Sequence, residues 1–393
     1  MDSSGSAIKI ENVWKVFGNT SVEALDAIQN QKISKTEALE KYNSVIGVSD
    51  VSFDVKQGEI FCVMGLSGSG KSTLVRHINR LLEPTSGKIL INGQDVMTLD
   101  RENLQELRNK KIGMVFQNFA LMPHRSVVDN IAMPLEIRGI SKNDRLDAAN
   151  KILEIVELQG WGNKFAHELS GGMQQRVGLA RALAADPDFL LMDEPFSALD
   201  PLIRRQLQSE FIKLSKQMKK TTVFITHDLD EAVRVGHRIA IMRDGKIMQL
   251  GSPAEIYDYP MNKYVADFIG SPSMNFIKGE IKDQCFTVGD HKISVKGYAT
   301  EASLTEGQKT WIGIRPEHVV LGEAVKKADY KATITADIVE PMGADTLVWT
   351  EFAGQPFRIR LNGKFPVASG QELPIGINAS TVSLFDLESE ERL

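Results

Sequence analysis

The sequence predicts an α/β domain followed by a smaller, β-rich domain. Through the first 275 of the 393 residues, short apolar runs alternate with longer segments of helical periodicity, which is typical of an α/β core. After Pro272, short β-branched runs broken by Gly and Pro replace this pattern and predict a small barrel. The length also fits two or three domains. We therefore expect an α/β domain over 1–275 and an all-β domain over 276–393.

The composition is that of an ordinary globular protein. Hydrophobic residues make up 42% and charged residues 25% of the chain, which argues against a wholly disordered, collagen-like or coiled-coil protein. The formal charge of −5, without a block of like charges, disfavours a nucleic-acid partner. Cys62 and Cys285 form neither a disulfide framework nor a zinc motif, which suggests a reducing cytosol. No apolar run reaches about 18 residues and the first residues lack a secretion signal, so any membrane role is expected to come from a partner.

The elements of the first domain follow one another in the order that a phosphate-binding unit requires. A strand-like run at 52–55 leads to 60–64, a continuous apolar run typical of a strand buried on both faces. A Gly-rich turn comes next, and from Ser72 the apolar residues have helical spacing until Pro84. Further strands are expected at 88–91, 112–116, 189–192, 222–225 and 238–242, helices at 144–156, 174–185 and 202–217, and β-domain strands at 292–295, 311–314, 331–339, 346–350 and 356–360.

The Gly-rich turn has the spacing of a phosphate-binding loop, between a buried strand and a helix. Its glycines let consecutive N–H groups point at phosphate oxygens, and the following helix directs its positive end to the same place. We expect Lys71 to reach the β- and γ-phosphates and Ser72 to bind Mg²⁺. A merely flexible Gly/Ser loop is the alternative, and the flanking strand and helix argue against it. The expected ATP-binding residues of this segment are Gly65, Leu66, Ser67, Gly68, Ser69, Gly70, Lys71, Ser72 and Thr73.

A second strand ends in two carboxylates. The apolar run from Phe189 is followed by Asp193 and Glu194, the arrangement of a strand that holds the metal of a bound nucleotide. Asp193 is the expected Mg²⁺ ligand, mostly through water, and Glu194 the general base that activates the attacking water. The alternative is a helix start, because both residues precede Pro195 and would also suit an N-terminal cap.

The segment Leu169-Ser170-Gly171-Gly172-Met173-Gln174-Gln175-Arg176 resembles the signature motif of the ATP-binding subunits of ABC transporters. Ser197-Ala198-Leu199-Asp200 is similar to the D-loop of that family. Gln117 stands at the place of its Q-loop glutamine, His227 at that of its switch histidine, and Phe17 at that of the aromatic that stacks on adenine. Alone, His227 and Gln117 would more often be structural, but their spacing from the other motifs favours the functional interpretation.

The resemblance implies a P-loop NTPase of ABC type with a helical subdomain at about 118–168 that contacts membrane subunits through exposed apolar residues. It implies catalytic roles for Glu194, His227 and Gln117, with Ser72, Gln117 and Asp193 at the metal. Because each motif occurs once, it also implies a head-to-tail homodimer, in which each chain's signature contacts the ATP of the other. The signature residues expected to do so are Ser170, Gly171, Gly172 and Gln174, with Asp200 in the D-loop.

Two segments, 79–87 and 116–124, resemble those of importers for glycine betaine, proline betaine, choline and other quaternary amines. A polar helical insertion at 19–47, in which Ser34 and Glu37 have the spacing of a capping box, also resembles that subfamily. The end of the chain differs, because the 313–318 segment and the β-rich tail resemble the OB-like TOBE domain of sugar and polyamine importers instead of a paired CBS module. This difference disfavours osmotic gating and favours catabolic uptake of a methylated amine such as choline or trimethylamine N-oxide.

These inferences together predict the ATP-hydrolysing motor of an importer, with ATP and Mg²⁺ as cofactors. The expected partners are a second copy of the chain, integral membrane permease subunits and, indirectly, an extracytoplasmic substrate-binding protein, with no nucleic acid. The expected location is peripheral, on the cytoplasmic face of the inner membrane. Alternatives are an importer ATPase for a polyamine or sugar and a soluble ABC ATPase that does not transport; a non-catalytic nucleotide-binding regulator is disfavoured by the intact Lys71, Asp193, Glu194 and His227.

Overall fold

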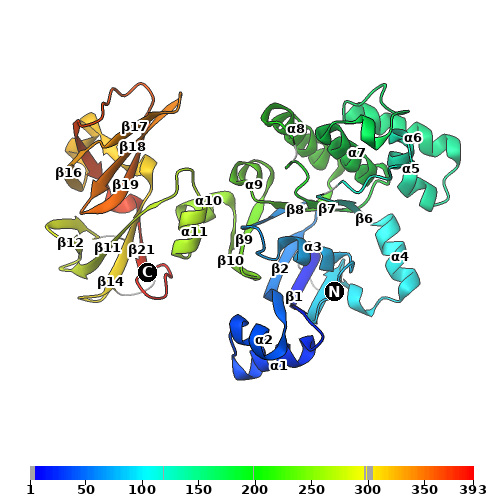
Figure 1. The fold of residues 1–393 in the computed structure, drawn as a ribbon, viewed down its shortest axis with the longest axis horizontal. Helices are drawn as coiled ribbons and strands as arrows, with labels where there is room; N and C mark the ends of the chain where they lie inside the picture. The colour runs from blue at the N-terminus through cyan, green and yellow to red at the C-terminus, as the bar shows by residue number, and fades with distance from the viewer. Residues whose placement is uncertain (1–4, 118, 198, 296–297, 299–303) are drawn as a thin grey trace. The chain divides into compact units, whose positions relative to one another are not determined.

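A computed structural model gives the fold of the chain and describes all residues except 1–4, 118, 198, 296–297 and 299–303 (Figure 1). The chain divides into two compact units, Met1–Pro253 and Ala254–Leu393. Asn118, the first residue of the expected helical subdomain, and Ala198 of the D-loop segment lie outside the described residues. The boundary expected between 275 and 276 falls inside the second unit and stays a prediction.

The first unit is built on a six-stranded sheet whose central strands are almost entirely apolar. Its order is β10 (Lys246–Gly251), β9 (Arg238–Arg243), β3 (Ile60–Met64), β8 (Thr221–Thr226), β7 (Phe189–Asp193) and β6 (Ile112–Val115). All neighbouring pairs are parallel except β9 with β10. Every residue of β3, β7 and β8 is buried, which explains why continuous apolar runs predicted these strands.

A second, antiparallel sheet packs against the first. Its order is β2 (Val45–Lys56), β1 (Ser6–Phe17), β4 (Ser86–Ile91) and β5 (Gln94–Asp95). The expected strand at 88–91 is therefore present, but in this sheet and not among the parallel strands, because it pairs with β1. The buried face of this sheet, with Ile10 and Val55, shares one apolar core with Phe61 and Val63 of β3 and with Leu74 of the following helix.

The helices of the first unit surround these sheets or form a separate cluster. They are α1 (Ser21–Gln31), α2 (Lys35–Tyr42), α3 (Lys71–Ile78), α4 (Arg101–Lys110), α5 (Val127–Ile137), α6 (Lys142–Ile155), α7 (Gly171–Ala184), α8 (Pro201–Met218) and α9 (Leu229–Val235), with 3₁₀ turns at Val96–Thr98 and Ala166–Glu168. The insertion forms α1 and α2, and the Ser34–Glu37 capping box is confirmed at the start of α2. Among the described residues, no helix combines the length and the apolar character needed to span a membrane.

The expected helical subdomain corresponds to α5 and α6, which pack on α7 (Figure 1). Their shared core includes Ile131 of α5, Leu153 of α6 and Val177 of α7. The prediction of exposed apolar side chains on this region is confirmed, since Ile137 is 55% exposed and Trp161 is 38% exposed. Such side chains are informative only when they gather around a groove, because single exposed apolar residues are common on any protein.

The second unit is β-rich. After α10 (Pro253–Asp258), which begins at the last residue of the first unit, and α11 (Lys263–Phe268), the described strands of this unit form one five-stranded and two three-stranded sheets. The five-stranded sheet has the order β13 (His291–Ser294), β12 (Cys285–Val288), β11 (Asn275–Lys282), β14 (Lys309–Ile314) and β21 (Val382–Asp386). One three-stranded sheet has the order β15 (Val320–Leu321), β20 (Glu372–Ile377) and β16 (Tyr330–Thr335). The other has the order β17 (Ile338–Pro341), β18 (Asp345–Phe352) and β19 (Gln355–Asn362). In the described part of this unit, 3₁₀ turns at Pro316–His318, Gly322–Lys327 and Ala379–Thr381 lie between strands. The run expected as one strand at 331–339 is two strands, β16 and β17, in different sheets, yet one core joins all three sheets.

A buried histidine in α3 makes the stability of the first unit dependent on pH. His77 is fully buried, its Nδ1 lies 2.6 Å from the Leu82 carbonyl oxygen, and burial lowers its pKa to about 4. An unfolded chain takes up this proton near pH 6.5, so between about pH 6.5 and about pH 4 the unfolded state binds more protons. The free energy of unfolding should therefore fall as the pH drops through this range, by roughly 3 kcal/mol in total.

Replacing His77 by Gln tests this expectation. Chemical denaturation at about pH 7.5 and about pH 5 should show a pH-dependent loss of stability that is roughly 2 kcal/mol smaller in His77→Gln than in the native chain. The matched control is His124→Gln, which changes an exposed histidine and should show the same pH-dependent loss of stability as the native chain. An unchanged pH dependence in His77→Gln would show that His77 is not the titrating group.

Candidate functional site

The phosphate loop lies between β3 and α3, as the sequence predicts. Gly65 has φ +153°, and a Cβ there would lie 2.2 Å from the Met242 carbonyl oxygen, so a side chain cannot be accommodated without displacing backbone. Ser69 is 5% exposed, and its Oγ has no hydrogen-bond partner. A buried hydroxyl without a partner is costly in an isolated protein and is well suited to a ligand that supplies acceptor oxygens, as a phosphate does.

Lys71 is buried at the start of α3. It is 6% exposed and its Nζ donates hydrogen bonds of 2.8 Å to the Gly65 and Leu66 carbonyl oxygens. Burial lowers the pKa of Lys71, and the nearby carboxylates of Glu194 and Asp193 oppose this shift. The ammonium group is thus held on the loop itself, at the place where the phosphates of a nucleotide would compete with the two carbonyl oxygens.

Asp193 and Ser72 lie side by side at the ends of β7 and the phosphate loop. Asp193 is completely buried, and the Ser72 Oγ donates a 2.8 Å hydrogen bond to its Oδ1. Burial raises the pKa of Asp193, while the bond from Ser72 and the charge of Arg76, whose Nη2 lies 3.5 Å from Oδ2, lower it. Arg76 has no counterpart in the sequence analysis, because nothing in its helical position signals a contact with a strand end about 117 residues away.

This pair fits a magnesium ion. Mg²⁺ is usually held by one or two protein oxygens together with water and phosphate oxygens, so a hydroxyl and a carboxylate 2.8 Å apart are a suitable donor set. Among the described residues, no group of three or more His, Cys, Asp and Glu side chains could hold a metal by itself. A metal at this place would therefore depend on the nucleotide for most of its ligands.

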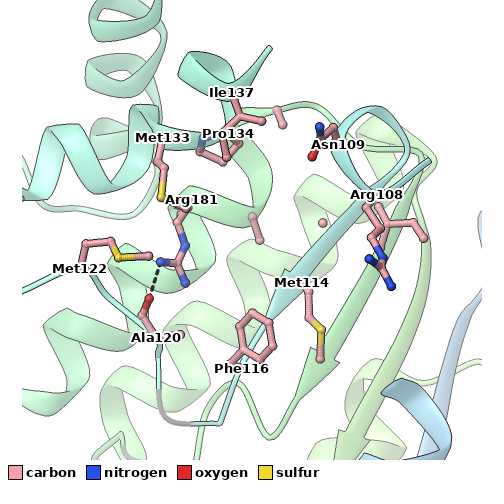
Figure 2. Close-up of a pocket in the computed structure, with 14 residues that line it drawn as sticks. Arg108, Asn109, Met114, Phe116, Ala120, Met122, Met133, Pro134, Ile137 and Arg181 are labelled. Carbon is pink, nitrogen blue, oxygen red and sulfur yellow. Dashed lines mark hydrogen bonds between the residues drawn. The ribbon is translucent and has the colours of Figure 1, made fainter. Parts of the chain in front are cut away.

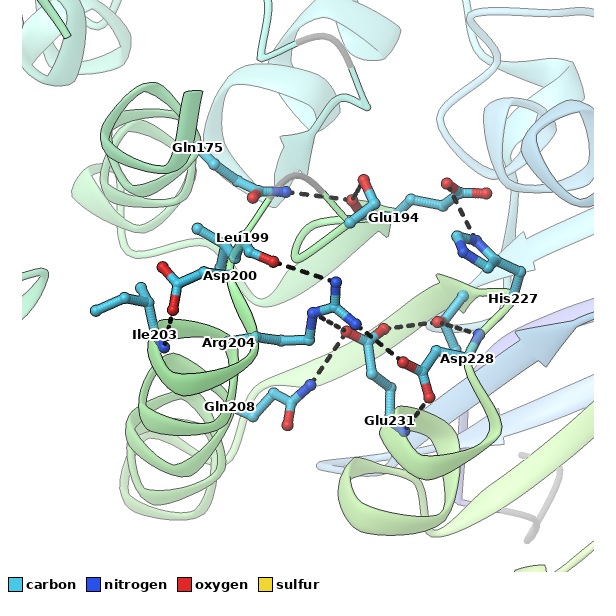
Figure 3. Close-up of polar contacts among 12 residues, drawn as sticks. Gln175, Glu194, Leu199, Asp200, Ile203, Arg204, Gln208, His227, Asp228 and Glu231 are labelled. Carbon is cyan, nitrogen blue, oxygen red and sulfur yellow. Dashed lines mark hydrogen bonds and ion pairs between the residues drawn. The ribbon is translucent and has the colours of Figure 1, made fainter. Parts of the chain in front are cut away.

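Glu194 contacts the other two predicted catalytic residues, and its contact with His227 is shown in Figure 3. Its Oε2 lies 3.2 Å from the Gln117 Nε2 and 3.4 Å from the His227 Nδ1. The backbone of Glu194 is left-handed, with φ +49°, and its N–H donates to the Ile225 carbonyl oxygen of β8 at 3.1 Å. This conformation is uncommon outside Gly and turns the carboxylate out of the buried strand toward the strand ends.

A polar network behind Glu194 was not predicted. Gln175 of α7 is 2% exposed and its Nε2 donates to the Glu194 carbonyl oxygen at 3.4 Å. Arg204 of α8 donates to the Leu199 carbonyl oxygen at 3.2 Å and to the Asp228 carboxylate at 3.1 Å, and its Nε lies 3.9 Å from the Oε1 of Glu231 (Figure 3). Sequence spacing does not indicate the contacts of Gln175 with Glu194 or of Arg204 with Asp228 and Glu231, because each joins elements that only the fold brings together.

Glu231 is the buried acid of this network. It is 4% exposed and accepts hydrogen bonds from the Thr226 Oγ1 at 2.6 Å and the Gln208 Nε2 at 3.1 Å. Burial raises its pKa, and these hydrogen bonds and Arg204 lower it. Because Thr226 directly precedes His227, the network fixes the backbone that carries this histidine.

The signature segment begins a helix. Ser170 is the N-cap of α7, and its Oγ accepts a 3.3 Å hydrogen bond from the Met173 N–H. Gln174 donates its side-chain amide to the Ala166 and Leu169 carbonyl oxygens of its own chain. Gly171 and Gly172 form the first turn, which directs unpaired N–H groups outward. Asp200 caps α8, accepting hydrogen bonds from the Leu202 and Ile203 N–H groups at 3.2 and 3.1 Å.

Phe17, the expected adenine-stacking residue, ends β1 and is 40% exposed. The Lys15 Nζ lies over its ring, 5.2 Å from the ring centre, and makes a cation–π contact with it. Gly47 lies close to the ring, because a Cβ at this glycine would be 2.6 Å from the Phe17 Cε2. The ring is therefore fixed by its neighbours and still has exposed surface for a flat ligand.

An apolar cavity of about 270 Å³ lies between β6 and α5. Figure 2 shows Met133, Pro134 and Ile137 of α5 on one side and Met114 and Phe116 on the other. The Arg181 guanidinium also lines the cavity and donates to the Ala120 and Phe119 carbonyl oxygens at 2.6 and 2.7 Å. The remaining lining residues are Arg108, Asn109, Ile112, Gly113, Met122, Ala182 and Ala185.

Family comparisons match both units. Residues 48–197 match the ABC transporter family, 270–319 the MalK OB fold domain and 312–385 the TOBE domain. These matches confirm the predicted fold class, an ABC-type ATPase with a C-terminal OB-like and TOBE-type β domain. The roles of the individual site residues stay predictions.

Several characterised proteins are similar to the chain. The glycine betaine transport ATP-binding protein OpuAA of Bacillus subtilis (strain 168) is 42% identical over 381 residues, covering 96% of this chain and 89% of OpuAA. The trimethylamine N-oxide transport system ATP-binding protein TmoW of Pelagibacter ubique (strain HTCC1062) is 52% identical over 265 residues, covering 67% of this chain and 77% of TmoW. A solved dimeric structure of the ATP-binding cassette MJ0796, in a post-hydrolysis state with ADP and Pi, has a TM-score of 0.54 and 32% identity, covering 63% of this chain and 98% of that one. The chain therefore belongs to the ATP-binding proteins of ABC transporters and is an ATPase.

Proposed function

We propose that this chain is the ATP-hydrolysing subunit of an importer for a quaternary or methylated amine, such as glycine betaine, choline or trimethylamine N-oxide. The observation that carries the solute class is the likeness to OpuAA, which extends over 96% of the chain. The likeness to TmoW supports the same class of small methylated amine. None of the residues described above contacts the solute, so the class rests on these relatives and not on the ATP site.

The arrangement of Glu194, Gln117 and His227 supports their roles in hydrolysis. The Glu194 carboxylate acts as the general base, because it lies at the end of β7 beside the buried Asp193 and can take a proton from water at the γ-phosphate. His227 and Gln117, both within 3.4 Å of this carboxylate, orient it and the water. Lys71 binds the β- and γ-phosphates, and Phe17 stacks on the adenine.

Mg²⁺ fits beside the phosphates. Ser72, Gln117 and Asp193 would hold it, and it would supply positive charge that offsets the charge developing on the phosphate oxygens. Ser72 and Asp193 are already oriented toward each other by their own hydrogen bond. The chain's contribution is thus an oriented pair of oxygen ligands in a buried position.

A homodimer completes this site. Among the described residues, no hydrogen bond joins the signature segment to the phosphate loop, which supports a role for Ser170, Gly171 and Gly172 on the nucleotide of a second copy. The helix start at α7 offers N–H groups and the positive end of a dipole to the γ-phosphate. The dimeric state of the similar cassette MJ0796 supports the same arrangement.

The apolar cavity beside α5 is the proposed docking site for a membrane subunit. Its apolar walls and the exposed Ile137 suit a short apolar helix of a permease. The substitution Ile137→Lys should reduce co-purification of the chain with its membrane subunits by about tenfold, since a charge would be buried in the contact. The control is Ile155→Lys, an exposed position of α6 that does not line the cavity. Equal recovery of both variants, each with the native thermal unfolding temperature, would place the contact elsewhere.

ATPase activity of the reconstituted complex tests the solute class. Glycine betaine, choline or trimethylamine N-oxide should stimulate hydrolysis, whereas sugars and polyamines should not. Stimulation only by a sugar or a polyamine would overturn the proposal in favour of a second candidate, an importer for that solute, which the match of the second unit to the MalK OB fold domain favours.

A further inference from the structure

The insertion helix α2 begins with a lysine, although a cation is unfavourable at a helix N-terminus. Lys35 is the first residue of α2, directly after the Ser34 cap. The positive end of the helix dipole repels a positive charge in the first turn, whereas Glu37 in the same turn and Lys41 in the last turn are placed as the dipole favours. Helix stability therefore does not account for Lys35.

Lys35 instead joins the insertion to a turn that lies 209 residues further along the chain. Its Nζ donates a hydrogen bond to the Asp244 carbonyl oxygen, in the tight turn between β9 and β10. Burial lowers the pKa of Lys35, the Asp244 carboxylate opposes this shift, and Lys246 adds to it. A lysine with a partly desolvated ammonium group, in an unfavourable helix position, is held there by this contact.

The same turn supports the phosphate loop from behind. The Gly245 N–H donates to the Ser69 carbonyl oxygen at 3.0 Å, and the Gly245 carbonyl oxygen accepts from the Ser49 N–H at 2.8 Å. The loop is also in tight contact with β2, because a Cβ at Gly70 would lie 2.3 Å from the Gly47 carbonyl oxygen. A shift of the turn must therefore move the backbone of the loop or break these contacts.

We propose that Lys35 is a positioning residue for ATP binding and that the α1–α2 insertion acts on the phosphate loop through it. Lys35 donates a hydrogen bond to the Asp244–Gly245 turn, and this turn donates one to the Ser69 carbonyl oxygen of the phosphate loop. These two contacts keep the N–H groups of the loop in the orientation that phosphates require. The proposal rests on the ATPase activity of the chain and not on the identity of the solute.

The effect should be on nucleotide affinity and not on the chemical step. Lys35 contacts a turn behind the loop, whereas Glu194 and His227 lie at the ends of β7 and β8. Loss of one hydrogen bond that orients the loop should weaken ATP binding by about three- to tenfold. The kcat at saturating ATP should remain within about twofold of the native value, so the KM carries the change.

The test compares Lys35→Met, Lys35→Arg and Lys41→Met in the full chain. Lys35→Met keeps the aliphatic stem and removes the donor, Lys35→Arg restores a donor, and Lys41→Met removes an exposed lysine of the same helix. Displacement of a fluorescent ATP analogue by ATP and by inorganic tripolyphosphate gives the affinities. We expect weaker binding of both competitors to Lys35→Met, native-like binding to Lys41→Met, and recovery in Lys35→Arg.

Three outcomes would overturn the proposal. The first is an ATP affinity in Lys35→Met equal to that in Lys41→Met. The second is a loss for ATP without a loss for tripolyphosphate, which would place the effect at the adenine side near Phe17. The third is a fall in kcat with an unchanged KM. In the first case, a lower unfolding temperature of Lys35→Met would assign Lys35 a role in stability alone.

Discussion

Replacing Glu194 by Gln should reduce ATP turnover by about 100- to 10,000-fold and leave ATP binding intact. The amide keeps the size of the side chain and can still contact Gln117 and His227, which lie 3.2 and 3.4 Å from the carboxylate. It cannot accept the proton of the attacking water. ATP then stays uncleaved between two copies of the chain, and a closed dimer should accumulate.

Two measurements check this expectation. Phosphate release under single-turnover conditions reports the chemical step, and light scattering with ATP and Mg²⁺ reports the dimer. The matched control is Glu106→Gln on α4, an exposed acid paired with Lys110, which should retain native turnover. Native turnover by Glu194→Gln would remove Glu194 from the role of general base.

Replacing Lys71 by Met should weaken ATP binding by roughly 100-fold. The substitution keeps most of the volume of a side chain that is 6% exposed, and it removes the ammonium group beside the buried Asp193 and the Glu194 carboxylate. Without this cation, bound phosphates would be repelled by the two carboxylates, and no positive side chain of the loop would offset this repulsion. Hydrolysis at cellular ATP concentrations should fall accordingly.

Calorimetric titration with ATP and Mg²⁺ measures the effect, and thermal unfolding of the nucleotide-free chain shows whether the fold is kept. Lys88→Met, an exposed lysine of β4, is the control. An ATP affinity of Lys71→Met within about threefold of the native chain would contradict the assignment of Lys71 to the phosphates.

The strongest sequence signals were those in which neighbouring residues determine the structure by themselves. The apolar runs at Ile60–Met64 and Phe189–Asp193 are fully buried, so their composition alone identifies them as central strands. The phosphate loop is equally local, because its glycines and its flanking strand and helix are contiguous. The Ser34–Glu37 capping box was predicted for the same reason.

Elements that depend on distant pairing were missed or placed in the wrong sheet. Strand β1 was not predicted, since its pairing with β2 is irregular at several points, including one near Asn12, and these irregularities disturb the alternation of apolar residues. The strand at 88–91 was found, but only its pairing with β1 shows to which sheet it belongs. Tertiary contacts decide both cases.

In the candidate site, too, local motifs were predicted and contacts between distant residues were not. Motif spacing selected Gln117, Asp193, Glu194 and His227, and the structure brings the carboxylate of Glu194 within 3.4 Å of both Gln117 and His227. The supporting residues Gln175, Arg204 and Glu231 had no such signal, because a glutamine or arginine on a helix is ordinary until its partner is known. Family resemblance therefore selected the candidate catalytic residues and not the residues that contact and support them.

The Arg204 guanidinium has a consequence for how this protein can vary. It joins the Leu199 carbonyl oxygen, just before the D-loop aspartate, to Asp228, just after the switch histidine, and it lies beside the buried Glu231. Loss of the Arg204 charge would leave the buried Glu231 without the cation that faces it, whereas loss of Glu231 would leave Arg204 paired with Asp228. A change at position 204 should therefore disturb the segments on both sides of the candidate catalytic centre at once.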